Sequence, residues 1–194
     1  IIIKALQQLT LQGLPAHLAI IGDGEERQSL QQLSHQLGLS QRVHFIGEQD
    51  RIASLLRGGV DVFVSGAREE VFGLVLAEAG LCQLPVVAPR VGGIPAVVDD
   101  GQTGLLVASE DPQAMANALA LLQRHQQRRR QMGRAGKRRV MQRFTIERNV
   151  EQFDQLYQRL LSDDTQRMGW TRHWQLGTAL KLALTSTCKA LQQR

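Results

Sequence analysis

Residues 61–99, which read DVFVSGAREEVFGLVLAEAGLCQLPVVAPRVGGIPAVVD, decide the fold of this chain. Two apolar runs within it, residues 62–64 and 85–88, predict buried strands, because each is short and is bounded by turn residues. Between them lies an apolar, helix-like segment that carries one carboxylate, Glu78. Two strand ends therefore flank a loop that enters a helix, and open α/β sheets bind ligands at such places.

The loop that enters this helix combines features that suit both a phosphate and a sugar. Gly73 lets the backbone approach a ligand closely, and the unpaired N–H groups of the first helical turn attract phosphate. A carboxylate repels phosphate but accepts hydrogen bonds from sugar hydroxyl groups. We therefore expect Glu78 to bind a ribose and Glu70 to bind a hexose. Together these features indicate a nucleotide sugar.

Glu70 and Glu78 are separated by the seven residues VFGLVLA, and this string resembles the EX7E motif of retaining GT-B glycosyltransferases. Within that class the chain is similar to family 4, the group 1 glycosyltransferases, because residues 86–107 (VVAPRVGGIPAVVDDGQTGLLV) resemble the family's strand, glycine loop and following turn. The resemblance implies a Rossmann-like, doubly wound parallel sheet of the α/β class. It corresponds to the C-terminal domain of a GT-B fold, with a helical C-terminal extension.

The resemblance also implies roles for individual residues. Glu70 is the catalytic candidate, either as a nucleophile in a double displacement or as electrostatic support for front-face attack, and both mechanisms stay open. The substrate is a UDP- or GDP-linked sugar, and neither a metal nor another cofactor is expected. The residues expected to bind the donor are Glu78, Phe72, Gly73, Leu74, Val75, Gly22, Gly24, Ile46 and Gly47.

The two outlying glycine segments also fit purely structural explanations. Gly22 and Gly24 follow a strand and suit a turn into a helix as well as a ligand contact. Arg27 occupies the third glycine position of a dinucleotide fingerprint, which disfavours a hydride-transfer site. Ile46 and Gly47 end a strand whose backbone could read a nucleotide base, or could simply close a core strand.

Glu78 has a structural alternative too. A carboxylate within an apolar segment is costly to bury without a partner, so it should meet either a ligand or a cation. Arg68 and Arg90 are the cations that could pair with it. Two local features are also expected: Asp50 should cap a helix ending at Arg57, and Gln83 should take the left-handed conformation usually given to glycine at a helix end.

Strands and helices alternate as far as Val107, and three helical segments follow, at about residues 111–124, 126–143 and 145–161. We assign residues 1–161 to the donor domain and residues 162–194 to a basic amphipathic tail. The resemblance implies that the domain's first strand, a loop with an arginine and a lysine, and an acceptor-binding domain precede Ile1. We therefore expect this chain alone to bind donor weakly and to transfer nothing.

The basic charge is concentrated in the tail. The sequence has 23 Lys and Arg against 18 Asp and Glu. Five of the bases and none of the acids follow Asp164, so the positive and negative charges of the preceding residues are equal in number. This balance argues against nucleic-acid binding by the domain. Trp170 and Trp174 in the tail suit either a membrane surface or packing on an acceptor-binding domain. The arginine-rich triplets 128–130 and 137–139 are expected to form a solvated helix face, with a role at a membrane surface as the alternative.

These features favour a cytoplasmic enzyme that binds a nucleotide-sugar donor, with a glycan or lipid-linked acceptor held by the acceptor-binding domain. Contact of the tail with the inner face of the membrane is one alternative for its location. The alternative function is a non-catalytic nucleotide-sugar-binding or scaffold domain. Cys82 and Cys188 have no metal-ligand spacing and fit free thiols in a reducing compartment.

Overall fold

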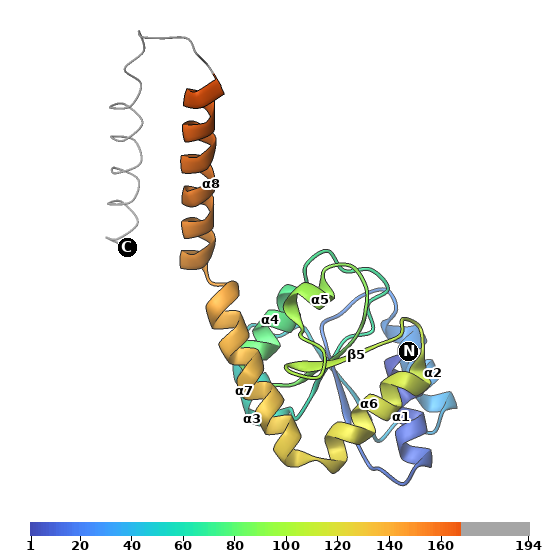
Figure 1. Ribbon diagram of the computed structural model, residues 1–194. Helices are drawn as coiled ribbons and strands as arrows, with labels where there is room; N and C mark the ends of the chain where they lie inside the picture. The colour runs from blue at the N-terminus through green and yellow to red at the C-terminus, as the bar shows by residue number, and fades with distance from the viewer. Residues whose placement is uncertain (168–194) are drawn as a thin grey trace. The chain divides into compact units, whose positions relative to one another are not determined.

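The computed structural model describes residues 1–167 (Figure 1). The chain divides into two units, Ile1–Asn149 and Val150–Arg194. The first unit contains parallel strands covered by helices, so the predicted α/β class is confirmed. Its helices are α1 (Ile2–Leu11), α2 (Arg27–Gln36), α3 (Ile52–Gly59), α4 (Leu74–Leu81), α5 (Ile94–Val97), α6 (Pro112–Arg124) and α7 (Gln126–Arg143).

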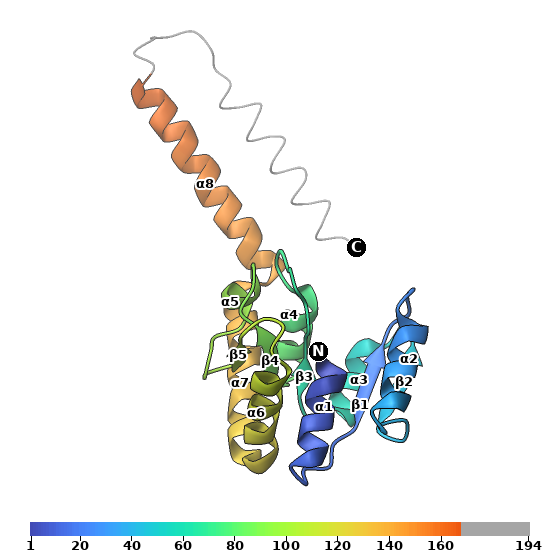
Figure 2. The same cartoon turned by 90° about the vertical axis from the view of Figure 1, so that its right-hand side faces the viewer.

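The strands form two parallel sheets rather than the single sheet expected. One sheet pairs β1 (Leu18–Ile21) with β2 (Val43–Gly47), and the other has the order β3 (Phe63–Val64), β4 (Val86–Pro89), β5 (Gly104–Val107). Within residues 1–167, β1 bonds only to β2 and β3 only to β4, because no described strand lies between β1 and β3. Figure 2 shows β1 and β2 beside α2, and β3 to β5 beside α4 and α6.

The central strand β4 is buried on both faces, which explains its unbroken apolar sequence. Val87 packs with residues of α1 and α6, whereas Val86 and Ala88 pack with residues of α4 and α5. Side chains that alternate along β4 thus enter two different cores. Figure 1 shows these two helix groups, α1 with α6 and α4 with α5, on either side of β5. This packing fixes the carboxyl ends of β3 and β4, where the chain turns toward α4 and α5.

The sequence predicted the residue that begins α6 correctly and the residue that caps α3 wrongly. Asp111 caps α6, since its side chain accepts the N–H of Ala114 at 2.9 Å, and a proline follows at the first helical position. Asp50 does not cap α3, so that prediction is wrong. Arg51 is the capping residue, and its carbonyl accepts the Ser54 hydroxyl at 2.8 Å, which closes the first turn without a carboxylate.

The end of α4 confirms the prediction for Gln83, which has a φ of 61°. Its N–H donates to the Gly80 carbonyl at 2.8 Å, and the N–H of Leu84 donates to the Ala79 carbonyl at 3.0 Å. These two bonds form a Schellman motif, in which the left-handed position normally holds glycine because a Cβ is strained there.

Replacing Gln83 with glycine should raise the free energy of unfolding by about 1 kcal/mol, because the left-handed strain disappears. Urea denaturation of the wild-type and variant chains measures this change. Gln12→Gly is the matched control, since Gln12 ends α1 with a φ of −80° and carries no such strain. Equal effects of the two substitutions would contradict the assignment of strain to Gln83.

Helix α8 (Ile146–Arg167) carries the chain into the second unit and continues past residue 161, where the donor domain was expected to end. Within it, the rings of Phe153 and Tyr157 stack with their centroids 6.3 Å apart. The tail residues 168–194, including Trp170, Trp174 and Cys188, lie outside the described residues, and the domain boundary stays a prediction. Among the helices described, none combines the length and apolarity that crossing a bilayer requires.

Candidate functional site

The carboxyl ends of β3 and β4 hold the segment that contains Glu70. Gly73 caps α4 with a φ of 91° and is buried, so the backbone turns sharply into the helix. A Cβ at Gly73 would lie 2.8 Å from a methyl group of Leu76, and the positive φ would strain any other residue there. The predicted loop, helix start and acidic residue are therefore placed as the sequence indicated.

Glu70 is fixed through its backbone and its side chain. Its carbonyl accepts the N–H of Gly93 at 2.8 Å, and its carboxylate accepts the N–H of Phe72 at 3.3 Å. The Phe72 ring packs edge-on against Phe144, with the ring centroids 5.5 Å apart. The loop before α4 is thus held from the β4 side and from the end of α7.

The glycine pair after β4 touches the Glu70 loop so closely that side chains cannot fit. A Cβ at Gly92, whose φ is 47°, would overlap the Glu70 carbonyl oxygen and lie 3.0 Å from the carbonyl carbon. A Cβ at Gly93 would overlap the Val71 carbonyl oxygen in the same way. The sequence marked this pair as a glycine loop but did not indicate that it positions Glu70. Only the fold brings the two segments together.

The start of α4 offers donors to an anion. The N–H groups of Leu76 and Ala77 bond to the Gly73 carbonyl, whereas those of Leu74 and Val75 lie at the first two helical positions, which have no acceptor within the helix. Leu74 is 69% exposed and Val75 49% exposed, so this turn faces solvent. Such a turn suits a phosphate, with the helix dipole adding about 0.3–1 kcal/mol.

Glu78 is exposed, which corrects the argument that its burial demands a partner. It lies on the same face of α4 as the exposed Leu74 and Val75, about 6 Å along the helix axis from Leu74. The proposed cation partners are also excluded, because Arg68 pairs with Glu110 at 2.8 Å and Arg90 pairs with Asp100. A solvent-facing carboxylate can accept hydroxyl groups without a burial cost.

The outlying glycines also meet in the fold. The N–H of Gly22 donates to the Gly47 carbonyl at 2.8 Å, and both residues have a positive φ, 113° and 77°. The N–H of Gly24 bonds to Asp23, and the carbonyl of Ile46 accepts the Gln49 amide at 3.4 Å. Within residues 1–167 no hydrogen bond joins this group to the Glu70 loop. The predicted site residues therefore form two separate groups, one at the ends of β1 and β2 and one at the ends of β3 and β4.

Arg27 is a residue whose position the sequence did not indicate. Its guanidinium pairs with Asp23 at 2.9 Å and lies over the Phe45 ring, 5.9 Å from the centroid. A cation therefore stands beside Gly47 at the ends of β1 and β2. Asp23 lies in the loop before α2 and Arg27 is the first residue of that helix, so the available signal was the short spacing of opposite charges. In the described part of the chain, no His, Cys, Asp and Glu side chains cluster in a way that could hold a metal.

Comparison with known proteins decides the family. The family model described as glycosyl transferases group 1 matches residues 1–139. The chain belongs to this family. The N-acetyl-alpha-D-glucosaminyl L-malate synthase of Bacillus anthracis is 37% identical over 149 residues, which are 77% of this chain and 39% of that protein. The D-inositol 3-phosphate glycosyltransferase of Corynebacterium urealyticum is 36% identical over 142 residues, 72% of this chain and 33% of that protein.

Two solved structures show the same fold. The HepE protein of Anabaena in complex with UDP superimposes with a TM-score of 0.71 and 30% identity, covering 83% of this chain and 44% of that one. The C-terminal domain of a glycosyl transferase group 1 family protein (LpcC) from Francisella tularensis gives a TM-score of 0.65 and 25% identity. This match covers 74% of the present chain and 77% of that domain. The group 1 chain thus has the fold of a GT-B C-terminal domain.

Proposed function

We propose that this group 1 chain is the donor-binding half of a retaining glycosyltransferase, which moves a sugar from a nucleotide sugar to a glycan or lipid-linked acceptor. The observation that carries the proposal is the arrangement around α4. One short segment carries three features. The carboxylate of Glu70 is fixed before the helix, and the N–H groups of Leu74 and Val75 have no acceptor within the helix. The exposed carboxylate of Glu78 follows one turn later.

Each part of this arrangement has a task that its chemistry suits. The N–H groups of Leu74 and Val75 bind the diphosphate, because they point from the positive end of a helix. Glu78 accepts the ribose hydroxyl groups, and Glu70 accepts hydroxyl groups of the transferred hexose and supports positive charge at its anomeric carbon. Phe72 and Gly73 supply backbone contacts beside them. The ends of β1 and β2, with Gly22, Gly24, Ile46 and Gly47, contact the nucleoside.

A uridine nucleotide is the donor that the relatives favour. HepE of Anabaena has been solved with UDP and with UDP-glucose, at 30% identity to this chain in both complexes. A GDP-linked sugar remains the other candidate. The acceptor would be bound by a separate domain. The basic, tryptophan-containing residues 168–194 suit contact with an anionic membrane surface on the cytoplasmic side, where a lipid-linked acceptor would be available.

Calorimetric titration with UDP, GDP and their sugar conjugates tests the proposal. One nucleotide should bind saturably, and Glu78→Ala should weaken its binding about tenfold to a hundredfold, because charge-assisted hydrogen bonds to the ribose are lost. Glu69→Ala is the matched control, since it removes an equal charge from the adjacent loop and should leave the affinity unchanged. Equal losses in both variants, or no binding of any nucleotide, would count against the assigned site.

A further inference from the structure

Helix α7 carries eight Lys and Arg residues and no acid between Gln126 and Arg143. Two of its arginines have structural tasks, which corrects the expectation of a wholly solvated face. Arg129 donates to the Leu122 and Gln123 carbonyls at the end of α6, and Arg139 donates to the Ala96 and Val97 carbonyls at α5. Of the other bases on α7, Arg130, Arg134 and Lys137 are simply exposed, whereas Arg128 and Arg138 line a hollow.

Three other arginines line one hollow of about 780 Å³ between the α6–α7 junction and the turn before β5. Arg124 ends α6, and Arg128 and Arg138 belong to α7. None of the three has an ion pair within residues 1–167. No acidic residue lines the hollow, whose other lining residues are Gly101, Gln102, His125, Gln126, Gln127, Gln131, Met132 and Ala135.

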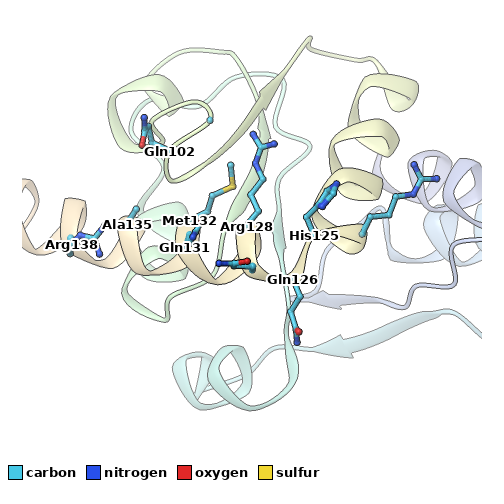
Figure 3. A pocket seen from close by; sticks show the side chains of 11 residues that line it. Gln102, His125, Gln126, Arg128, Gln131, Met132, Ala135 and Arg138 are labelled. Atoms are coloured by element: carbon cyan, nitrogen blue, oxygen red, sulfur yellow. The ribbon is translucent and has the colours of Figure 1, made fainter.

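The spacing of the arginines favours an elongated ligand. Arg128 and Arg138 are ten residues apart, which separates their Cα atoms by about 15 Å along a helix axis. Figure 3 shows these two side chains at separate points along α7, with Gln102 of the turn opposite them and Met132 between. Guanidinium groups that are not neutralised by acids raise the local positive potential, and each can bind a phosphate through two hydrogen bonds.

The hollow is separate from the nucleotide-sugar site. The turn at Gly101 and Gln102 precedes β5, so it lies at the amino end of the parallel sheet. The Glu70 loop and the Gly92–Gly93 pair follow β3 and β4, and therefore lie at the carboxyl end of the same sheet. One ligand cannot serve both sites at once across the buried strand β4.

We propose that this hollow binds an extended anion that carries two or more phosphate groups. Arg124, Arg128 and Arg138 bind the phosphates, and the side chains of Gln127 and Gln131 donate hydrogen bonds between them. The phosphates belong either to a soluble chain or to the headgroups of an anionic lipid layer. Both sources present the same chemistry to the same three arginines, and experiment separates them.

The test titrates the full chain with sodium triphosphate and, separately, measures sedimentation with vesicles of phosphatidylglycerol and phosphatidylcholine. The triple variant Arg124→Gln, Arg128→Gln, Arg138→Gln should weaken binding about tenfold or more, since charge-assisted hydrogen bonds are lost. The matched control is Arg130→Gln, Arg134→Gln, Lys137→Gln, which removes the same charge from exposed positions of α7 outside the hollow. This control should keep the wild-type affinity.

Binding of triphosphate that depends on the hollow would assign a soluble anion, whereas hollow-dependent binding of the anionic vesicles alone would assign a lipid headgroup. Equal weakening by both triple variants would overturn the proposal, because binding would then depend on the net charge of the chain and not on the three arginines of the hollow. Failure of both probes to bind would overturn it as well. The melting temperature of each variant separates a binding defect from misfolding. The single variant Arg138→Gln serves the same purpose, because it changes one exposed residue only.

Discussion

Replacing Gly92 with alanine should weaken binding of the nucleotide sugar about tenfold to a hundredfold, because the displaced Glu70 loop would lose the charge-assisted hydrogen bonds proposed for the sugar. The new Cβ would overlap the Glu70 carbonyl oxygen, so the loop before α4 must move. Because Glu70 is assigned to the sugar, binding of the free nucleoside diphosphate should fall less. Titration with both ligands measures this difference.

Gly13→Ala separates this collision from backbone strain. Gly13 has a φ of 71°, also in the left-handed region, but a Cβ there would meet nothing within 4 Å. It should lower the melting temperature without changing the affinity for either ligand. If Gly92→Ala weakens the nucleotide and the nucleotide sugar equally, Gly92 serves the general fold and does not position Glu70.

Gly133→Ala should lower the free energy of unfolding by about 3 kcal/mol, a large share of the stability of an ordinary domain. Gly133 is buried where α7 crosses the end of α4. A Cβ there would overlap the Gln83 carbonyl oxygen and lie 2.6 Å from the carbonyl carbon, and neither backbone can yield cheaply. Urea denaturation monitored by circular dichroism measures the loss.

Gly136→Ala provides the control on the same helix. Gly136 is also buried, but its nearest neighbour would be the Gly80 Cα at 3.5 Å, which is an ordinary contact. Alanine favours a helix over glycine by about 1 kcal/mol, so this variant should match or exceed the wild-type stability. A similar loss in both variants would contradict the prediction, because it would show that the loss does not come from the collision with the Gln83 carbonyl.

Local pattern was enough for much of the fold. Short apolar runs such as residues 85–88 became buried strands, because a strand covered on both faces needs no alternation. Asp111 before a proline marked the start of α6, and the lack of glycine at Gln83 indicated a strained helix end. The string around Glu70 and Glu78 indicated the family, which the comparisons then confirmed.

The sequence by itself therefore determined the class of fold, the family and the segment that carries the candidate site. Tertiary structure alone decided that Gly92 and Gly93 hold Glu70, that Gly22 bonds to Gly47, and that Glu78 faces solvent. It also decided which arginines of α7 are structural and which line a hollow. The physical reason is that these contacts join segments from different strand ends and helices, whose spacing along the chain carries no signal of their meeting.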